Sequence, residues 1–234
     1  MSATDAGQEL VINATVNLEK QLVFVAIPKN GTTSVRTQIV PPGVQLVPAS
    51  HLNIVQIRDL FYIYFLLKEF GKNRHFPTQA VATDTEIRTL AKNEFDRCFK
   101  FAAVRNPWAR AVSLYSRREG VQVSDEMTFE DFCHNHVYAS DTCIHPTAHK
   151  NQFDWICDEQ GQCIVDYVYK LEEFEKAIGE IAERTNGRVV LESLEENHNP
   201  QSGSRAYREF YNDQTRKLIA KQFEKDIDEF QYSF

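Results

Sequence analysis

Glycine and proline are scarce in this sequence, at 9 and 8 of 234 residues. With hydrophobic residues at 42%, this composition excludes a collagen-like, low-complexity or globally disordered chain. Long apolar runs are also missing: the longest, residues 61–67, is far shorter than the roughly 20 residues that a membrane-spanning helix needs. The first ten residues are polar and acidic, so we expect neither a signal peptide nor a membrane span.

The chain also lacks an excess of basic residues. Its 26 Lys and Arg stand against 33 Asp and Glu, which gives a net charge of -7. A broad basic face for nucleic acid is therefore not expected, although net charge leaves room for a local basic pocket.

None of the five cysteines forms a C-x-x-C pair. Together with the polar first residues, this favours thiols in a reducing compartment, and we expect a cytoplasmic protein. Cys157 and Cys163 bracket a predicted turn, so a local disulfide is the alternative for these two residues.

The spacing of apolar residues predicts alternating strands and helices. Residues 22–27 and 98–104 are continuous apolar runs, which are typical of central strands covered on both faces. Helices are predicted at residues 32–40, 52–70, 84–93, 107–118, 129–134, 152–157, 172–185 and near the C-terminus, and a short strand at 188–191. After a polar lead-in at residues 1–21, we expect a single α/β domain over residues 22–234, with a central parallel sheet flanked by helices.

The segment after the first predicted strand has the composition of a phosphate-binding loop. Gly31 allows a tight turn and a close approach of the backbone to an oxygen, and the following helix start offers unpaired N–H groups. Lys29 adds a positive charge, and Thr32, Thr33 and Ser34 add hydroxyl donors. We predict a P-loop-like nucleotide site at the carboxyl ends of the strands, the alternative being an ordinary strand-to-helix turn.

This loop differs from the one that binds ATP and GTP. That motif, G-x-x-x-x-G-K-[ST], places its lysine after the second glycine. In this chain Lys29 precedes Gly31, and Ala26 stands where the first glycine would be. The sequence therefore predicts a phosphate loop of another type.

A second set of polar residues follows the second predicted strand. Arg105 stands at the carboxyl end of that strand, and Asn106-Pro107 is a favourable N-cap and first-turn pair for a helix. Ser113 lies about two turns further on. A guanidinium and a hydroxyl placed in this way suit a phosphate group, whereas the alternative is a surface arginine and a helix-filling serine.

The segments IPKNGTTS, from residue 27, and VRNPWARAVSLY, from residue 104, resemble the two nucleotide-binding signatures of the PAPS-dependent sulfotransferases. The branch that they resemble most contains the carbohydrate O-sulfotransferases and their bacterial relatives. The resemblance covers residues 22–234, and both motifs stand in the family order, each after a predicted strand. One departure is Tyr-Lys-Leu-Glu at residues 169–172, where relatives often carry GRFE.

The resemblance implies that the chain uses PAPS, 3'-phosphoadenosine 5'-phosphosulfate, as co-substrate. The first loop, including Lys29 and Asn30, is then expected to hold the 5'-phosphosulfate. Arg105 and Ser113 are expected to hold the 3'-phosphate. Lys29 would also neutralise the oxygen of the leaving phosphate, with no metal required.

The resemblance also indicates a histidine as general base for the acceptor hydroxyl. His75, in NRHFPT, matches a similar H-x-x-T segment of relatives, and a neutral imidazole suits this task. His51 is the second candidate, and a carboxylate is a further alternative. Near the C-terminus, Arg205 and Arg208 form a basic turn that we expect to close over the nucleotide; the alternative is a solvated charge cluster.

A zinc site is a rival interpretation of one loop region. Its residues are crowded within 17 positions of the chain, but their spacing matches no zinc module: Cys133, His136, Cys143, His145 and His149. We therefore expect no metal.

The predicted function is in-line transfer of the sulfuryl group of PAPS to an acceptor hydroxyl, on a carbohydrate or a small hydroxylated metabolite. Residues 121–165 match no pattern that would identify the acceptor. The alternatives are a phosphotransferase that uses a nucleoside triphosphate, and a nucleotide- or glycan-binding protein without catalysis.

Overall fold

The computed structural model describes residues 9–72, 82–116, 127–135, 150–193 and 206–234. The strands are β1 Leu10–Val11, β2 Val16–Asn17, β3 Leu22–Val25, β4 Val44–Gln45, β5 Phe99–Val104 and β6 Tyr167–Lys170. The α-helices are α1 Thr32–Ile39, α2 Ile54–Lys72, α3 Asp84–Arg97, α4 Pro107–Ser116, α5 Phe129–Asn135, α6 Phe174–Arg184, α7 Asp213–Gln222 and α8 Glu224–Phe230. Short 3-10 helices are η2 Gln152–Trp155, η3 Leu171–Glu173 and η5 Ala206–Phe210.

The main sheet has the strand order β2-β3-β5-β6. β3, β5 and β6 are parallel to one another, and β2 adds an antiparallel edge. Phe101 in the centre pairs with Phe24 on one side and with Tyr167 on the other. The predicted α/β fold with a parallel-rich sheet is confirmed.

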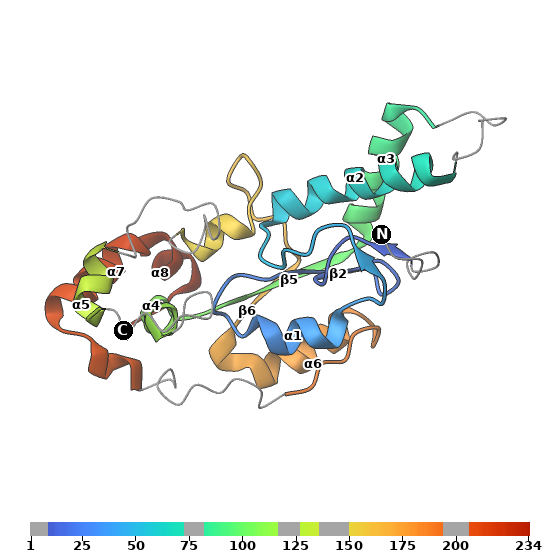
Figure 1. The fold of residues 1–234 in the computed structure, drawn as a ribbon. Helices are drawn as coiled ribbons and strands as arrows, with labels where there is room; N and C mark the ends of the chain where they lie inside the picture. Colours follow the sequence, from blue (N-terminus) through green and yellow to red (C-terminus); the bar gives the residue numbers. More distant parts are fainter. Residues whose placement is uncertain (1–8, 73–81, 117–126, 136–149, 194–205) are drawn as a thin grey trace.

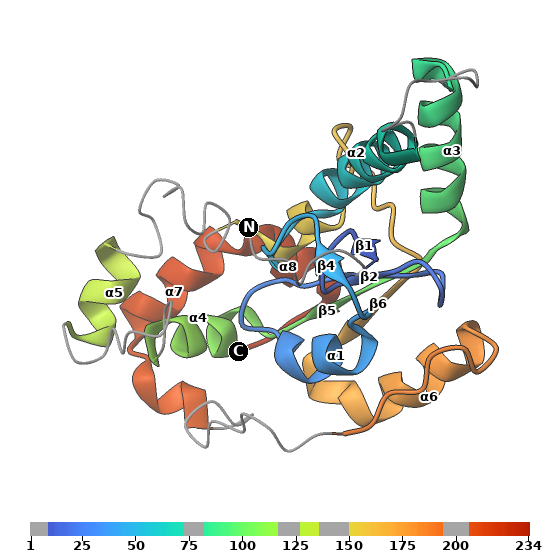
Figure 2. The same cartoon turned by 45° about the vertical axis from the view of Figure 1, so that its right-hand side comes forward.

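Helices cover both faces of this sheet, as Figures 1 and 2 show. Leu22 and Phe24 point to the face covered by α1 and α6, whereas Val23 and Val25 point to the face covered by α2. Alternate residues of a strand face opposite sides, and both sets are fully buried because helices cover both faces. This explains why the strand appears in the sequence as a continuous apolar run.

Besides the hydrophobic cores on the two faces of the sheet, a third hydrophobic cluster lies beyond the carboxyl ends of the strands. It consists of α4, α5, α7 and the last residues of the chain, and its core includes Trp108, Tyr115, Phe129 and Phe223 (Figure 1). The predicted C-terminal helix is divided into α7 and α8 at Phe223. The cluster covers the sheet edge to which both predicted nucleotide motifs lead.

Two predictions about strands were incomplete or wrong. β6 was not predicted as a strand, because its Tyr-Val-Tyr-Lys sequence is only partly apolar. Residues 188–191, predicted as a strand, pair with no strand in the described structure. The N–H of Val189 donates to Thr185 Oγ1 at 3.3 Å, so a side chain accepts the hydrogen bond that a neighbouring strand would otherwise accept.

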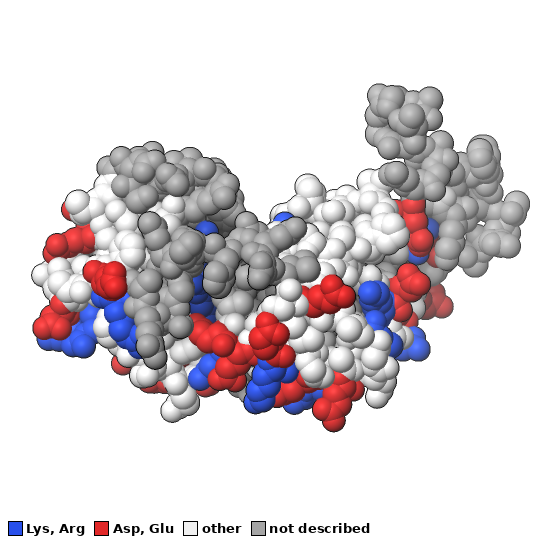
Figure 3. Space-filling view, turned by 90° about the horizontal axis from the view of Figure 1, so that it is seen from below, with Lys and Arg blue, Asp and Glu red and all other residues white. Residues whose placement is uncertain are grey.

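The predicted lead-in contributes to the domain. β2 pairs with β3, and Ile12 and Val16 are buried in the core. Within the described residues, no helix combines the length and apolarity that crossing a membrane requires. Seen from below (Figure 3), acidic and basic side chains are interspersed, and the described residues on this face form no broad basic surface.

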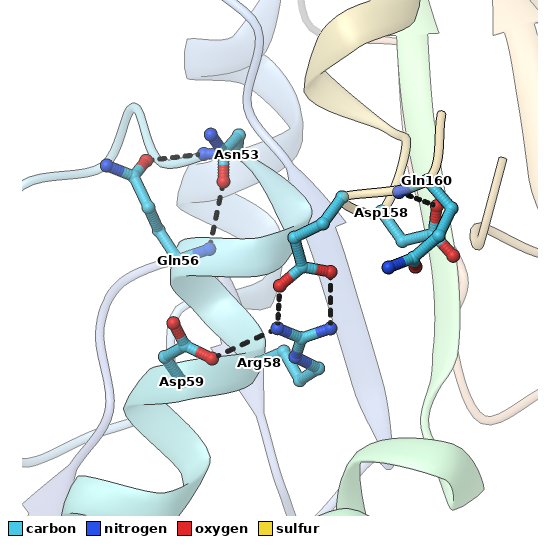
Figure 4. A network of polar contacts seen from close by, with 7 residues as sticks. Asn53, Gln56, Arg58, Asp59, Asp158 and Gln160 are labelled. Carbon is cyan, nitrogen blue, oxygen red and sulfur yellow. Dashed lines mark hydrogen bonds and ion pairs between the residues drawn. The ribbon is translucent and has the colours of Figure 1, made fainter. Parts of the chain in front are cut away.

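The hairpin between η2 and β6 brings two cysteines opposite each other. Cys157 pairs with Cys163 in an isolated antiparallel bridge, and both are free thiols. Arg58 of α2 holds the tip of this hairpin through an ion pair with Glu159, beside Asp158 (Figure 4). Because Arg58 and Glu159 are both partly exposed, the pair contributes little stability.

We predict that the described thiols differ sharply in reactivity. Burial raises the pKa of Cys98 and Cys133 to about 12 and that of Cys157 to about 11, so all three stay protonated at pH 8. Cys163 is exposed. Among these four thiols, brief treatment with iodoacetamide should therefore alkylate Cys163 first, as measured by peptide mass mapping. Cys143 lies outside the described residues and is scored separately. Equal labelling of Cys98 in the native protein would contradict the prediction.

Candidate functional site

Three loops meet at the carboxyl edge of the parallel strands. β3 leads into the loop that begins at Pro28, β5 leads into Arg105, and β6 leads into Leu171. The register pairs Val25 with Ala102 and Val104 with Lys170, so these strands end near the same level. Sheets of this type bind ligands at this edge. The structure thus brings the two predicted motifs to one place.

The first loop has an unusual backbone conformation. Lys29 and Gly31 both lie in the left-handed region, with φ of 70° and 67°. Such a conformation costs on the order of 1–3 kcal/mol at a residue other than glycine, and it occurs often at ligand sites. Gly31 is the N-cap of α1, no side chain caps this helix start, and its first turn has no acidic residue. These are the properties of an anion site at a helix N-terminus.

The loop side chains differ in burial. Asn30 is fully buried, and its Nδ2 donates to the carbonyl oxygen of Ala103 at 2.8 Å. Thr32 is also buried, whereas Thr33 is exposed and Ser34 is half-buried. Thr33 and Ser34 therefore offer accessible hydroxyls on the first turn of α1, while Asn30 ties the loop to β5.

Arg105 links the two motifs directly. Its Nη1 donates to the carbonyl oxygen of Lys29 at 3.1 Å, and its side chain is largely buried. Burial lowers the pKa of Arg105, and the nearby Glu172 opposes this effect. An arginine remains protonated in such a setting, so a positive charge is held beside the phosphate loop.

Asn106 starts α4 in the predicted manner. Its Oδ1 accepts from the backbone N–H groups of Trp108 at 3.1 Å and Ala109 at 3.3 Å. Its own N–H donates to Glu172 Oε1 at 2.8 Å, and its Nδ2 donates to the carbonyl oxygen of Ser233 at 2.9 Å. The start of α4 is thereby tied both to the loop after β6 and to the C-terminal residues.

Two further residues of the prediction lie on helices α4 and η5. Ser113 is buried on α4, 8% exposed, two turns after the helix start. Arg208 is exposed on η5, and its guanidinium lies over the rings of Tyr207, at 4.9 Å, and Phe234, at 5.6 Å. Phe234 also packs against Trp108, so that tryptophan is part of the core.

His51 lies beside the end of β3. Its Nδ1 is 2.7 Å from the carbonyl oxygen of Ala26. Because a carbonyl can only accept, Nδ1 carries the hydrogen, and the lone pair is on Nε2. The segment around His51 is held on both sides, since Ser50 bonds to Arg36 of α1 and Asn53 caps α2 (Figure 4).

Several predicted residues lie outside the described part of the chain. They are His75 and Arg205 of the nucleotide and base predictions, and His136, Cys143, His145 and His149 of the zinc alternative. Of the zinc alternative, Cys133 is described; it is buried among the aromatic rings of the third cluster, and burial raises its pKa to about 12. No group of potential metal ligands is found among the described residues.

The sequence prediction missed Gln152 and Asp226. Both are fully buried; Gln152 bonds to Asn30 and Arg105, and Asp226 bonds to Gln152. A signal for Asp226 exists in the sequence, because it follows Phe223 by three residues and so lies on the apolar face of the last helix. No comparable signal marks Gln152, whose neighbours come from distant parts of the chain.

Comparison with known proteins bears on the family that the two motifs resemble. A family model with the description "Sulfotransferase family" matches residues 13–233, which is nearly the whole chain. No curated protein and no solved structure gives a significant match. The family predicted from the two motifs is confirmed by the family model.

We predict that Gly31→Ala destabilises the protein by about 1–2 kcal/mol, because an L-residue with a Cβ is strained in the left-handed region. The added Cβ would also lie 2.6 Å from Leu171 Cδ1. Gly179→Ala is the matched control, since its Cβ meets no atom within 4 Å and its helical position gains about 0.5–1 kcal/mol. Urea unfolding measures both changes, and a Gly31→Ala protein as stable as the control would contradict the strain argument.

Proposed function

The chain belongs to the sulfotransferase family, and on that premise we propose that it transfers the sulfuryl group of PAPS to a hydroxyl acceptor. The acceptor is a carbohydrate or a small hydroxylated metabolite, and the second product is adenosine 3',5'-bisphosphate. The observation that carries the proposal is the contact between Arg105 Nη1 and the carbonyl oxygen of Lys29. This contact joins the loop proposed to hold the 5'-phosphosulfate to the side chain proposed to hold the 3'-phosphate.

The donor is held by both motifs in this proposal. The 5'-phosphosulfate lies at the start of α1, where the N–H groups after Gly31 and the hydroxyls of Thr33 and Ser34 are available. The 3'-phosphate is held by Arg105 and Ser113, because a guanidinium and a hydroxyl suit its oxygens. Arg208, and Arg205 outside the described residues, would close over the nucleotide from the C-terminal part of the chain.

Lys29 supplies charge where the reaction needs it. In an in-line displacement, negative charge develops on the oxygen that leaves with the nucleotide. An ammonium group on this loop, together with the start of α1, stabilises that charge. The proposal therefore needs no metal for this step.

Two histidines are candidates for the base that removes the acceptor proton. His75 is the first choice from the sequence resemblance. Support for His51 comes from its place: its Nδ1 donates to the carbonyl oxygen of Ala26, at the edge where the phosphate loop begins. The two are separated by experiment below.

A cytoplasmic location also remains a proposal, and the phosphate loop supports it. Asn30-Gly31-Thr32 is formally a glycosylation sequon. Asn30 is fully buried, and its Nδ2 donates two hydrogen bonds, to Ala103 O and to Gln152 Oε1. A glycan on that nitrogen is incompatible with the folded loop.

Nucleotide choice is the first test. Adenosine 3',5'-bisphosphate should raise the melting temperature more than AMP at equal concentration, because only the former offers the 3'-phosphate. Arg105→Ala should abolish the difference, since a bond to a charged group contributes about 1.5–3 kcal/mol. Arg97→Ala, on the exposed end of α3, is the control and should leave it intact. Equal shifts with the unmodified protein, or a stronger shift with ATP, would favour the phosphotransferase alternative.

Turnover tests the role of Lys29. Lys29→Met keeps the aliphatic part of the side chain and removes the charge. Turnover should fall by about 10²–10³-fold, as for other lost electrostatic donors, while affinity for adenosine 3',5'-bisphosphate changes much less. Stopped assays with labelled PAPS and a panel of sugars and phenols measure the rate. Binding of PAPS without turnover on any acceptor would favour the non-catalytic alternative.

The pH profile identifies the base. His75→Asn and His51→Asn are compared, and loss of the base should lower turnover by about 10²–10⁴-fold with nucleotide binding retained. A base must be neutral, so activity of the unmodified protein should rise with pH through the ordinary imidazole value of about 6.5. The variant that has lost the base should lose this limb. Full activity in both variants would mean that a carboxylate or water, and neither histidine, accepts the proton of the acceptor hydroxyl.

A further inference from the structure

We propose that Gln152, supported by Asp226, is a positioning residue of the donor site and couples the phosphate loop to Arg105. This inference rests on the proposed function, since it concerns the same nucleotide. Gln152 lies at the start of η2, 47 residues after Arg105 and 122 residues after Asn30, and it belongs to neither sequence motif.

The carboxamide of Gln152 uses its full hydrogen-bonding capacity. Its Oε1 accepts from the backbone N–H of Arg105 at 2.9 Å and from Asn30 Nδ2 at 2.7 Å. Its Nε2 donates to the carbonyl oxygen of Arg105 at 2.8 Å and to Asp226 Oδ2 at 3.1 Å. One side chain thus holds the backbone of Arg105 from both sides and holds the phosphate loop at Asn30.

The N–H and the carbonyl oxygen of Arg105 already define which way this carboxamide faces, and Asp226 reinforces that orientation. An ionised carboxylate accepts and cannot donate, so it requires the NH₂ group of Gln152 on its side. The other oxygen, Oδ1, accepts from the backbone N–H of Phe153 at 3.0 Å, which holds the carboxylate in place. The carbonyl oxygen of Gln152 is therefore directed toward Asn30 and the N–H of Arg105.

The orientation is passed on to the loop. Because Gln152 presents an oxygen, Asn30 must present its NH₂ group, which it shares between Gln152 Oε1 and the carbonyl oxygen of Ala103. Asn30 Oδ1 is then buried without a hydrogen-bond partner among the described residues. An unpaired buried acceptor costs about 1–3 kcal/mol, so the bonds on the other side must hold Asn30 against this loss.

Neighbouring contacts make this network part of the loop support. Arg110, fully buried on α4, donates from Nε to the carbonyl oxygen of Pro28 at 3.2 Å. Burial lowers the pKa of Arg110 to about 10, and the charge of Asp226 opposes the decrease. Successive loop residues are thus held by different side chains: Pro28 by Arg110, Lys29 by Arg105 and Asn30 by Gln152.

A positioning role has a specific consequence for ligand binding. Loss of the Gln152 bonds frees the backbone of Arg105 relative to the loop, and the nucleotide spans these two parts in the proposed function. The contribution of the 3'-phosphate should therefore fall. The quantity to measure is the ratio of dissociation constants for AMP and adenosine 3',5'-bisphosphate, which compares two ligands on one protein and so is insensitive to a uniform loss of stability.

The test compares Gln152→Met, Asp226→Asn and Trp155→Phe by isothermal titration with both nucleotides. Methionine keeps the volume of Gln152 without its bonds. Asparagine at residue 226 has a single acceptor oxygen for two donors, Gln152 Nε2 and the N–H of Phe153, so one of these donors must face an NH₂ group and the support of Gln152 is weakened. Trp155→Phe is the matched control, because Trp155 is a fully buried core residue of the same short helix and its indole N–H has no partner among the described residues.

We expect the ratio to fall at least fivefold in Gln152→Met and in Asp226→Asn, and to stay unchanged in Trp155→Phe. The KM for PAPS should rise in the first two variants, with the KM for the acceptor unchanged. Asp226→Asn provides the decision if Gln152→Met does not fold. A ratio retained in either folded variant would overturn the inference, whereas an unmodified protein that does not prefer adenosine 3',5'-bisphosphate over AMP would overturn the proposed function instead.

Discussion

The site depends on one constraint: the loop after β3 must be held in a strained form against an uncapped helix start. Two of its residues, Lys29 and Gly31, are left-handed, and no side chain caps α1. An anion site of this kind does not stabilise itself, because its N–H groups point to the place of a ligand. Its stability comes from hydrogen bonds that buried side chains make on the other side of the loop. Two of these side chains are charged, and a hydrogen bond from a charged group contributes about 1.5–3 kcal/mol.

Burial of charge is the cost of this arrangement. Three charged side chains are largely or fully removed from water. Burial lowers the pKa of Arg105 and Arg110 and raises that of Asp226, which in each case favours the neutral form. Such charges are tolerated only when hydrogen bonds satisfy them. Backbone carbonyls of the loop accept from the two arginines, and Gln152 and the N–H of Phe153 donate to the carboxylate. The same bonds therefore solvate the buried charges and shape the phosphate loop.

The fold class followed from the sequence because its central strands are buried on both faces. Residues 22–27 and 98–104 appear as continuous apolar runs, and the two strands lie in the middle of the sheet. β6 was missed because Tyr167 and Lys170 at its ends are only half-buried and do not continue an apolar run. The sequence of residues 188–191 is typical of a strand. However, the N–H of Val189 donates to the side chain of Thr185 and the N–H of Glu192 donates to that of Gln38, so these groups do not pair with a neighbouring strand.

The sequence by itself determined the chemistry of the two motifs and the cap of α4, because each depends on residues a few positions apart. Gly31 permits the left-handed turn before α1, and Asn106 caps α4 through bonds to residues two and three positions away. Only the tertiary structure decided how the motifs are joined. The contact from Arg105 to the loop spans 76 residues, and the bonds of Gln152 to Asn30 and Asp226 span 122 and 74. No local pattern records such contacts, since they exist only when the parallel strands bring their carboxyl ends to one edge.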